Sequence, residues 1–147
     1  MAKKIISNNR KASYEYHLQS NFEAGIVLTG TEVKAIRNQE INLSDSFCQF
    51  LNQDELFVRN MHVGRYQPGS YNNHESKRDR KLLLNKSELK KIKSKLKEKG
   101  IALIPVKIYL NERNIIKLEI ALAKGKKLYD KRNTIKERDI KREMMRK

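Results

Sequence analysis

Apolar and polar residues alternate with a period of two in six segments of the chain. This pattern is typical of β-strands that bury one face. It predicts strands over 12–18, 22–28, 45–51, 56–63, 104–110 and 116–122. A polar turn over 111–114 joins the last two strands into a hairpin. Pro105 lies on the opposite face from the apolar residues of its strand, which predicts a sheet edge or a bulge there.

Two further segments have the three-to-four-residue spacing of helices. Residues 32–37 are expected to form a short helix with an acidic residue in its first turn. Residues 85–100 start with a capping box, in which Asn85 is the cap and Glu88 stands three residues later. Gly100 suits the left-handed position that closes a helix. The apolar residues of this second helix share one face, and its other faces are almost entirely lysine.

Short strands joined by short turns, with internal helices and no β–α–β alternation, are typical of small barrels. The pattern therefore predicts a mainly β domain over residues 1–124. We expect a closed antiparallel barrel of the oligonucleotide-binding type, with about six strands and two to three flanking helices. Residues 64–80 have no clear periodicity and contain Pro68-Gly69, which predicts a long loop. Loops of this length in compact domains are usually functional or mobile.

The basic residues are concentrated in two blocks of the 147-residue chain, whose net charge is +16. Residues 77–99 hold eleven Lys/Arg against three acidic residues, and residues 124–147 hold eleven against four. The remainder of the chain is nearly neutral, so the charge is segregated along the sequence. The expected partner is a polyanion, first of all RNA or DNA.

Residues 125–147 form a second part of the chain, a basic tail. No strand pattern continues beyond Lys124, and the few apolar residues there cannot build a core. Thr134 and Glu137 match a capping box, but a helix of about 14 residues is marginal in isolation. We expect the tail to be disordered in the free protein and helical on a polyanionic surface.

Composition and motifs argue against several other classes of protein. One cysteine, Cys48, excludes an internal disulfide and suits a reducing compartment, so we expect a cytoplasmic protein. No apolar run approaches the roughly 20 residues of a membrane span, and the chain lacks the Trp typical of membrane-surface helices. Glycines spaced as in phosphate-binding loops are not followed by the required lysine. The three histidines lie far apart without other ligand residues, so we expect no metal, no cofactor and no catalysis.

Tyr66 and Tyr71 lie among polar and cationic residues of the predicted loop. Aromatic rings in such surroundings stack on unpaired bases, at about 1–3 kcal/mol for each stack. A solvent-exposed loop tyrosine fits the sequence equally well, so both interpretations stay open.

Three motifs, in order along the chain, resemble the bacterial SsrA-binding protein family, also called small protein B. The first runs over 22–25 and 30–37, the second over 80–85, and the third over 123–127, 129–132 and 135–139. The resemblance extends from about Asn9 to Lys141. One departure is Ser76 after His74-Glu75, where the family often has proline.

The resemblance implies a role in trans-translation, the rescue of ribosomes that stall on messages without a stop codon. Members bind the tRNA-like domain of transfer-messenger RNA and deliver it to the empty A site. The implied partners are this RNA and the ribosome, at its decoding centre, mRNA channel and 16S rRNA. Elongation factor Tu on the charged RNA is a further candidate partner. The family's barrel and unstructured C-terminal tail agree with the two parts read from the residues.

The resemblance also implies site residues, which fall into two groups. The predicted RNA-binding residues are Glu23, Lys34, Arg80, Lys81, Leu83, Asn85, Lys117 and Lys124. The predicted decoding-centre residues of the tail are Gly125, Lys126, Tyr129, Asp130, Lys131 and Arg132. Alternation along 116–122 places Lys117 opposite the apolar face, hence outward. For Glu23, an acceptor role toward bases or ribose hydroxyls stands beside a purely structural ion pair.

Two other functions stay open on the residues alone. A structural ribosomal protein would combine a barrel with a basic extension that threads through rRNA. An RNA-processing enzyme would cleave or modify the RNA in the presence of divalent metal.

Overall fold

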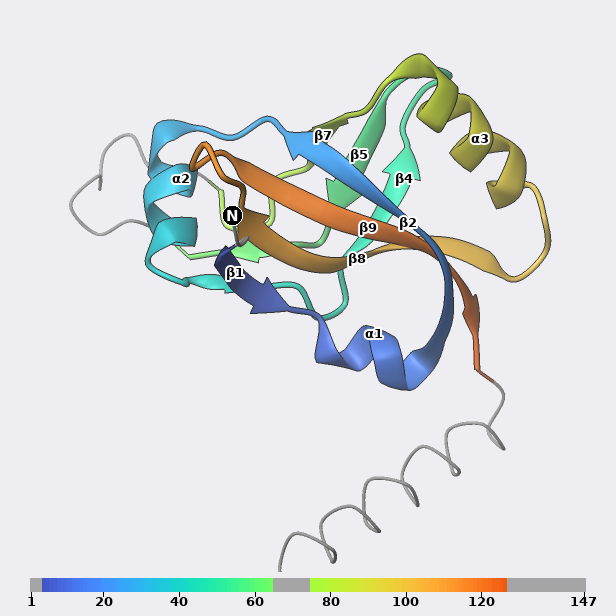
Figure 1. Cartoon of the computed structure of the whole chain (residues 1–147), viewed down its shortest axis with the longest axis horizontal. Helices are drawn as coiled ribbons and strands as arrows, with labels where there is room; N and C mark the ends of the chain where they lie inside the picture. Colours follow the sequence, from blue (N-terminus) through green and yellow to red (C-terminus); the bar gives the residue numbers. More distant parts are fainter. Residues whose placement is uncertain (1–3, 65–74, 127–147) are drawn as a thin grey trace, which may run out of the picture.

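The computed structural model describes residues 4–64 and 75–126, and antiparallel β-structure dominates it (Figure 1). This part of the chain holds nine strands and three helices. In chain order they are β1 (Lys4–Asn8), α1 (Arg10–Glu15), β2 (Tyr16–Ile26), α2 (Gly30–Arg37), β3 (Ile41–Asn42), β4 (Phe47–Phe50), β5 (Leu56–Arg59), β6 (His62–Val63), β7 (Arg80–Leu83), α3 (Lys86–Leu96), β8 (Ile101–Leu110) and β9 (Ile116–Gly125). None of the helices described is long and apolar enough to cross a membrane.

Six of the described strands hydrogen-bond in a ring. Their order is β8-β4-β5-β7-β2-β9, and the ring closes because β9 also pairs with β8. All of these pairings are antiparallel. Outside the ring, β1 pairs with β8, and β3 pairs with β6. The prediction of a mainly β, antiparallel domain is confirmed, and a ring of six strands matches the expected number.

Strand β8 is shared between two neighbours on one edge. Its Leu103 pairs with β4, whereas residues 107–110 pair with β1. Between these stretches the register with β9 shifts, from Pro105 to Lys107. The side-chain amide of Asn9 donates to the carbonyl of Pro105 at 2.8 Å. The predicted bulge at this proline is therefore confirmed, and it lets β8 change partners.

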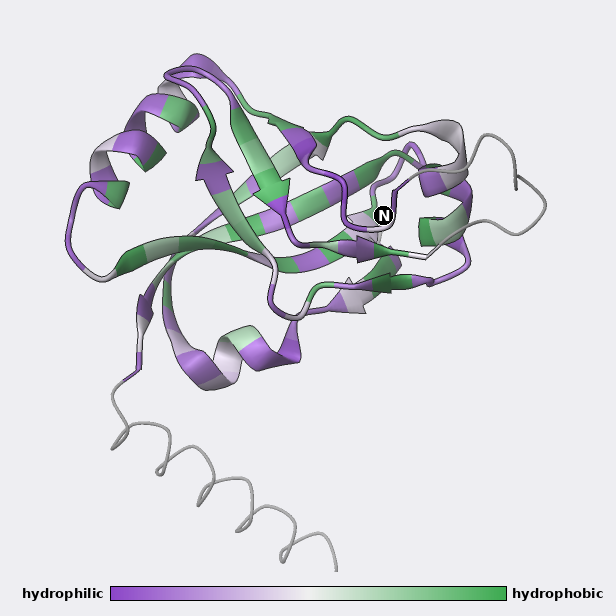
Figure 2. Cartoon of the chain, turned by 180° about the vertical axis from the view of Figure 1, so that it is seen from behind, coloured by the Kyte–Doolittle hydropathy of each residue, from purple (hydrophilic) through white to green (hydrophobic). Residues whose placement is uncertain are grey.

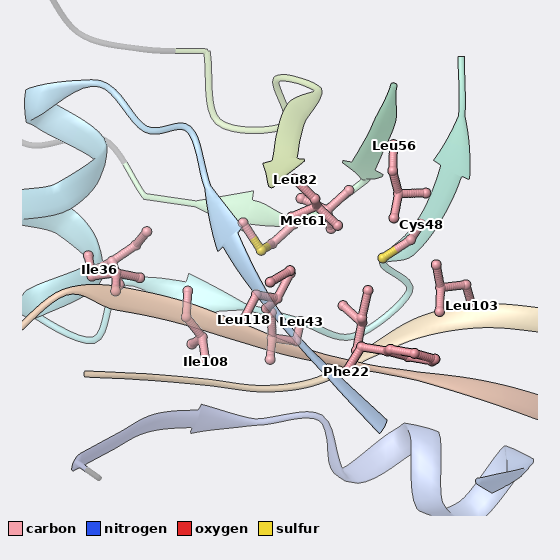
Figure 3. Close-up of a cluster of buried hydrophobic side chains, with 14 of the residues drawn as sticks. Phe22, Ile36, Leu43, Cys48, Leu56, Met61, Leu82, Leu103, Ile108 and Leu118 are labelled. Carbon is pink, nitrogen blue, oxygen red and sulfur yellow. The ribbon is translucent and has the colours of Figure 1, made fainter. Parts of the chain in front are cut away.

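The hydrophobic core lies inside the ring (Figure 3). Figure 2 shows the alternation of hydrophobic and hydrophilic positions along the strands that produces it. The inward residues of β9 are buried and its outward residues near the hairpin are not, as the period of two predicts. Cys48 is buried in this core, and burial raises the pKa of its thiol, so it is a packed and unreactive side chain.

Two helices with capping boxes lie toward opposite ends of the sheet (Figure 1). In α2, the Thr29 side chain accepts from the Glu32 backbone, and the Glu32 side chain accepts from the Thr29 backbone. In α3, Asn85 and Glu88 make the same exchange, which confirms the predicted capping box. Gly100, with φ of 82°, follows α3 in the left-handed conformation expected of it.

Residues 10–15 form a helix, so the strand predicted over 12–18 is wrong in its first half. The side chain of Asn9 accepts from the backbone of Ala12 and caps α1. Ala12 is then buried against Ile104 and Ala123, on the outer side of β8 and β9. Tertiary packing of a small side chain thus overrides the alternation of larger ones.

The strand prediction also missed β1, β3 and β7 and ran two strands together. Asn60, with φ of 62°, separates β5 from β6. Residues 81–84 are a lysine followed by three leucines and do not alternate. In β7, Leu82 is buried while Leu83 is 52% exposed, so a hydrophobic residue occupies an outward position. That exposure hides the strand from a hydropathy pattern and is a property of the surface described next.

Candidate nucleic-acid interface

The outer face of strands β7, β2, β9 and β8 brings several predicted site residues together. Leu83 pairs with Gly25, Gly25 pairs with Lys117, and Lys117 pairs with Tyr109. Side chains of directly paired residues point to the same face of an antiparallel sheet. These four residues therefore form one row across four strands, on the side away from the core.

A second row lies beside the first on the same face. Glu23 pairs with Glu119, which pairs in turn with Lys107. Lys107 Nζ lies 3.6 Å from Glu119 Oε2. Glu23 itself is exposed, while its neighbours Phe22 and Ala24 are buried in the core. We call these two rows together the outer face: Leu83, Gly25, Lys117, Tyr109, Glu23, Glu119 and Lys107.

Leu83 packs closely over Gly25 on the outer face. A Cβ atom placed on this glycine would be 3.3 Å from Cβ of Leu83 and 3.7 Å from its Cδ1. The absent side chain lets Leu83 lie tightly against this strand, with Lys117 on the other side of the glycine. Because Leu83 is exposed, it presents an apolar surface to solvent with a cation on the same row.

The carboxylate of Glu23 accepts a hydrogen bond from the hydroxyl of Tyr109. Tyr109 is 1% exposed, although it belongs to the outer row. Burial, together with the hydrogen bond and charge of Glu23, raises the pKa of Tyr109, so its hydroxyl stays a neutral donor. The partner of the Glu23 carboxylate in this contact is therefore a phenol, and both roles considered for Glu23 stay predictions.

Two more predicted residues adjoin the outer face. Asn85 Oδ1 caps α3 by accepting from Glu88 N at 2.9 Å, and also from Ser87 Oγ at 2.8 Å. Lys81 is half-exposed, two residues before Leu83, and its Nζ lies 3.0 Å from Glu55. Both residues have structural contacts, and both stand close enough along β7 to extend the outer face.

Arg80 has a different role from the one predicted for it. It is fully buried, and all five N–H donors of its guanidinium are used. Nε donates to Glu32, and Nη1 donates to the carbonyls of Met61 and Arg78 at 2.8 and 3.0 Å. Nη2 donates to the carbonyls of Glu75 and Ser76. The prediction of RNA contact is corrected here: Arg80 holds α2, β7 and the segment at 75–78 together.

Glu32 completes this buried cluster. Its side chain is fully buried and accepts from Arg80, from Arg78 Nη2 at 2.6 Å and from the Thr29 backbone at 2.9 Å. Burial works against its ionisation, but the bonds from Arg78 and Thr29 and the charge of Arg80 outweigh it. The pKa of Glu32 is therefore lowered.

Other predicted residues are not brought to the outer face. Lys34 is exposed on α2, off the sheet. Lys124 is exposed near the end of β9, seven residues and therefore about 23 Å along the strand from Lys117. Lys126 donates through its backbone to the Glu15 carbonyl at 2.7 Å and through Nζ to the Ser13 carbonyl at 3.0 Å.

The remaining tail residues predicted for the decoding centre, with the exception of exposed Gly125, are outside the described residues. These are Tyr129, Asp130, Lys131 and Arg132. The two loop tyrosines, Tyr66 and Tyr71, also lie outside them. Within 4–64 and 75–126, no group of three or more His, Cys, Asp or Glu is placed to hold a metal ion.

The lysine-rich faces of α3 are exposed and begin directly after Asn85. Three lysines line a groove of about 540 Å³ between α3 and the β4–β5 turn. They are Lys86, Lys90 and Lys93. In the described part of the chain, Lys86 and Lys90 have no carboxylate within 4.0 Å. Like charges four residues apart destabilise a helix slightly, which an anionic ligand would relieve.

A family model described as SmpB protein matches residues 6–147, nearly the whole chain. The chain belongs to the SmpB family. The resemblance read from the three motifs is thereby confirmed. An SsrA-binding protein of Bacteroides thetaiotaomicron is 53% identical over 138 residues, covering 94% of this chain and 91% of that protein. The SsrA-binding protein of Cytophaga hutchinsonii is 51% identical over 148 residues, covering 98% and 96%.

A solved SmpB structure has the same fold. It is described as "tmRNA-SmpB: a journey to the center of the bacterial ribosome". The matched chain is 43% identical and has a TM-score of 0.70, and the match covers 83% of this chain and 85% of that one.

The sequence prediction missed Gly25 and Tyr109 as members of the site. Alternation along 104–110 does place Tyr109 opposite buried Ile108, so its outward position was readable. The contact of Tyr109 with Glu23 could not be predicted, because the two residues are 86 positions apart and meet only when the ring of strands forms.

Proposed function

We propose that this protein binds the tRNA-like domain of transfer-messenger RNA and brings it to stalled ribosomes in the bacterial cytoplasm. It acts in trans-translation as an RNA-binding adaptor and not as an enzyme. The observation that carries the proposal is the convergence of Glu23, Leu83 and Lys117 on one outer face of an SmpB-family chain. The SsrA-binding name of the relatives and the solved tmRNA–SmpB structure support the same function.

The chemistry of the outer face suits folded RNA. Lys117 supplies a cation for a phosphate, and Leu83 supplies an apolar surface for a base or ribose. The Glu23 carboxylate accepts from base amino groups or ribose 2′-hydroxyls, which DNA lacks. Asn85 and Lys81 extend this surface along β7. Together these groups read the shape and edges of an RNA, while charge alone would hold any polyanion.

The lysines of α3 contribute most of the electrostatic attraction. They continue from Asn85, so an RNA on the outer face passes within reach of them. Each phosphate that they neutralise releases counterions, and affinity falls as salt rises. Lys34 and Lys124 add to the general field of the protein at greater distance.

We further propose that the ring of six strands is a barrel of the oligonucleotide-binding type, extending over residues 1–124. Its closure through β8 and β9, with helices at its ends, supports that class. Residues 125–147 serve as a separate functional part that works at the decoding centre and in the vacant mRNA channel. Their eleven basic residues, counted with Lys124, and the third family motif support this division.

The first experiment compares RNAs. The protein is titrated with the isolated tRNA-like domain and with a scrambled RNA of the same length, at two salt concentrations. We expect tight binding to the tRNA-like domain and much weaker binding to the scrambled RNA. Equal affinities would contradict the proposal and favour a general rRNA-binding role, which retention on ribosomal subunits after a high-salt wash would then support.

A second experiment separates the two parts. Deleting residues 131–147 should leave most of the affinity for the RNA intact and abolish the tagging of stalled nascent chains. A Glu23→Ala variant should instead lose affinity for the RNA, and its tagging activity should fall only as a consequence. If the truncated protein no longer binds the RNA, the division of labour between barrel and tail is wrong.

A further inference from the structure

We propose that Tyr109 is a positioning residue that holds the Glu23 carboxylate in place for RNA recognition. The inference rests on the proposed function of the outer face. Its starting point is the hydrogen bond from the Tyr109 hydroxyl to the Glu23 carboxylate. No sequence motif links the two residues, and the contact exists only in the folded ring.

The geometry makes Tyr109 a bridge across the sheet. Tyr109 belongs to β8 and Glu23 to β2, and β9 lies between these strands. The tyrosine side chain crosses the outer side of β9, where the neighbouring outward residues are Lys117 and Glu119. Because Tyr109 is only 1% exposed, the packing around its side chain determines where the hydroxyl lies. A tyrosine has only two side-chain torsions, so little entropy is lost in keeping it there.

Glu23, by contrast, is an exposed side chain. An exposed glutamate samples several rotamers, and fixing one of them on binding costs free energy. A hydrogen bond from a buried donor reduces that cost, since one orientation is already favoured before RNA arrives. Preorganisation of this kind strengthens binding without adding a contact to the ligand.

The choice of a phenol as the partner has an electrostatic consequence. The charged groups around the tyrosine on the outer face are Glu23, Glu119, Lys107 and Lys117, and Lys107 lies 3.6 Å from Glu119. A lysine at position 109 would neutralise Glu23, whereas a neutral hydroxyl orients the carboxylate and leaves its charge. The raised pKa of Tyr109 keeps that donor neutral over the physiological range.

A retained negative charge beside the lysines of the outer face affects specificity. Phosphates are repelled from the carboxylate, whereas base amino groups and ribose hydroxyls donate to it. An RNA therefore binds in the register that sets such a donor against Glu23, with its phosphates on the lysines. Tyr109 thus contributes to the discrimination between RNAs more than to the general attraction of polyanions.

The test uses Tyr109→Phe, which keeps the packed aromatic side chain and removes only its hydroxyl. We expect affinity for the tRNA-like domain to fall about two- to tenfold, as for the cost of ordering one freed side chain on binding. Affinity for a scrambled RNA and the salt dependence should not change. Tyr16→Phe, which alters a half-buried tyrosine in the cluster beneath α1, is the matched control and should bind like wild type.

A double-mutant cycle separates positioning from a structural effect. In a Glu23→Ala background, Tyr109→Phe should cause no further loss of affinity, because the acceptor that the hydroxyl orients is gone. Equal losses in both backgrounds, or no loss in the wild-type background, would overturn the inference. If wild type itself fails to prefer the tRNA-like domain, the proposed function fails instead. Thermal melting of each variant shows whether any loss comes from unfolding.

Discussion

Replacing Arg80 by methionine tests the assignment of this residue to the framework of the protein. Methionine keeps much of the aliphatic stem and removes the guanidinium. The change leaves the buried carboxylate of Glu32 with Arg78 and Thr29 as its remaining donors, and it leaves several carbonyls around the former guanidinium without a donor. Breaking a buried ion pair by removing one partner costs about 3–5 kcal/mol.

That loss is large compared with the total stability of a domain, which is about 5–15 kcal/mol. At roughly 3 °C for each kcal/mol in a chain of this size, the melting temperature should fall by about 10–15 °C. The assay is thermal and urea unfolding followed by circular dichroism at pH 7. Lys81→Met is the matched control, because it removes the next cation along β7. Its exposed pair with Glu55 is worth at most about 1 kcal/mol.

Two results would refute this reasoning. One is an Arg80→Met variant that melts within about 2 °C of wild type. The other is a Lys81→Met variant that loses as much stability as Arg80→Met. Adding Glu32→Gln to Arg80→Met should restore part of the loss, since no buried charge then remains unpaired. At a temperature where the variant is folded, its affinity for RNA should equal that of wild type, because Arg80 does not reach the surface.

Three further predictions concern the outer face and the buried cluster. Lys117→Gln should weaken binding to the tRNA-like domain and reduce the slope of log K against log salt by about 1. The control Lys99→Gln should have a smaller effect on the affinity and on the slope. Equal effects of the two variants would show that Lys117 is not part of the interface. Gly25→Val should displace Leu83, because a Cβ at this position would lie 3.3 Å from Cβ of Leu83. We expect affinity to fall about tenfold and the melting temperature to fall by a few degrees, and unchanged binding would show that the position of Leu83 does not matter for the RNA. The lowered pKa of Glu32 means that its contribution to stability is present above about pH 4.5 and is lost as pH falls further. Urea unfolding between pH 7 and pH 3 should show this loss in wild type and a smaller one in Glu32→Gln, and parallel curves would contradict the assignment.

Much of the fold followed from residue patterns, and the failures have physical reasons. The final hairpin, the bulge at Pro105 and the capping box at Asn85 depend on local chemistry, so a single sequence shows them. The helix α1 depends on burial of Ala12 against strand residues that lie about 90 to 110 positions later. Strand β7 presents leucine to solvent at position 83, which breaks the pattern that identifies strands.

The candidate site also has features that the sequence predicted and features that depend on contacts between distant residues. The outward position of Lys117 followed from the alternation along its strand, and the motif around Glu23 and Leu83 indicated a shared role. The motif over 80–85 and the basic block around it suggested an exposed Arg80, but a cation in such a block can be buried when it meets a capping glutamate. The contact between Glu23 and Tyr109 depends on ring closure and register, which no local pattern encodes.

A nuclear magnetic resonance titration of the labelled protein with the tRNA-like domain tests the central claim most directly. The account predicts that the largest backbone shifts occur at Glu23, Gly25, Leu83 and Lys117, with smaller shifts along α3. Shifts confined to the groove between α1 and β4, with the outer face unchanged, would contradict it.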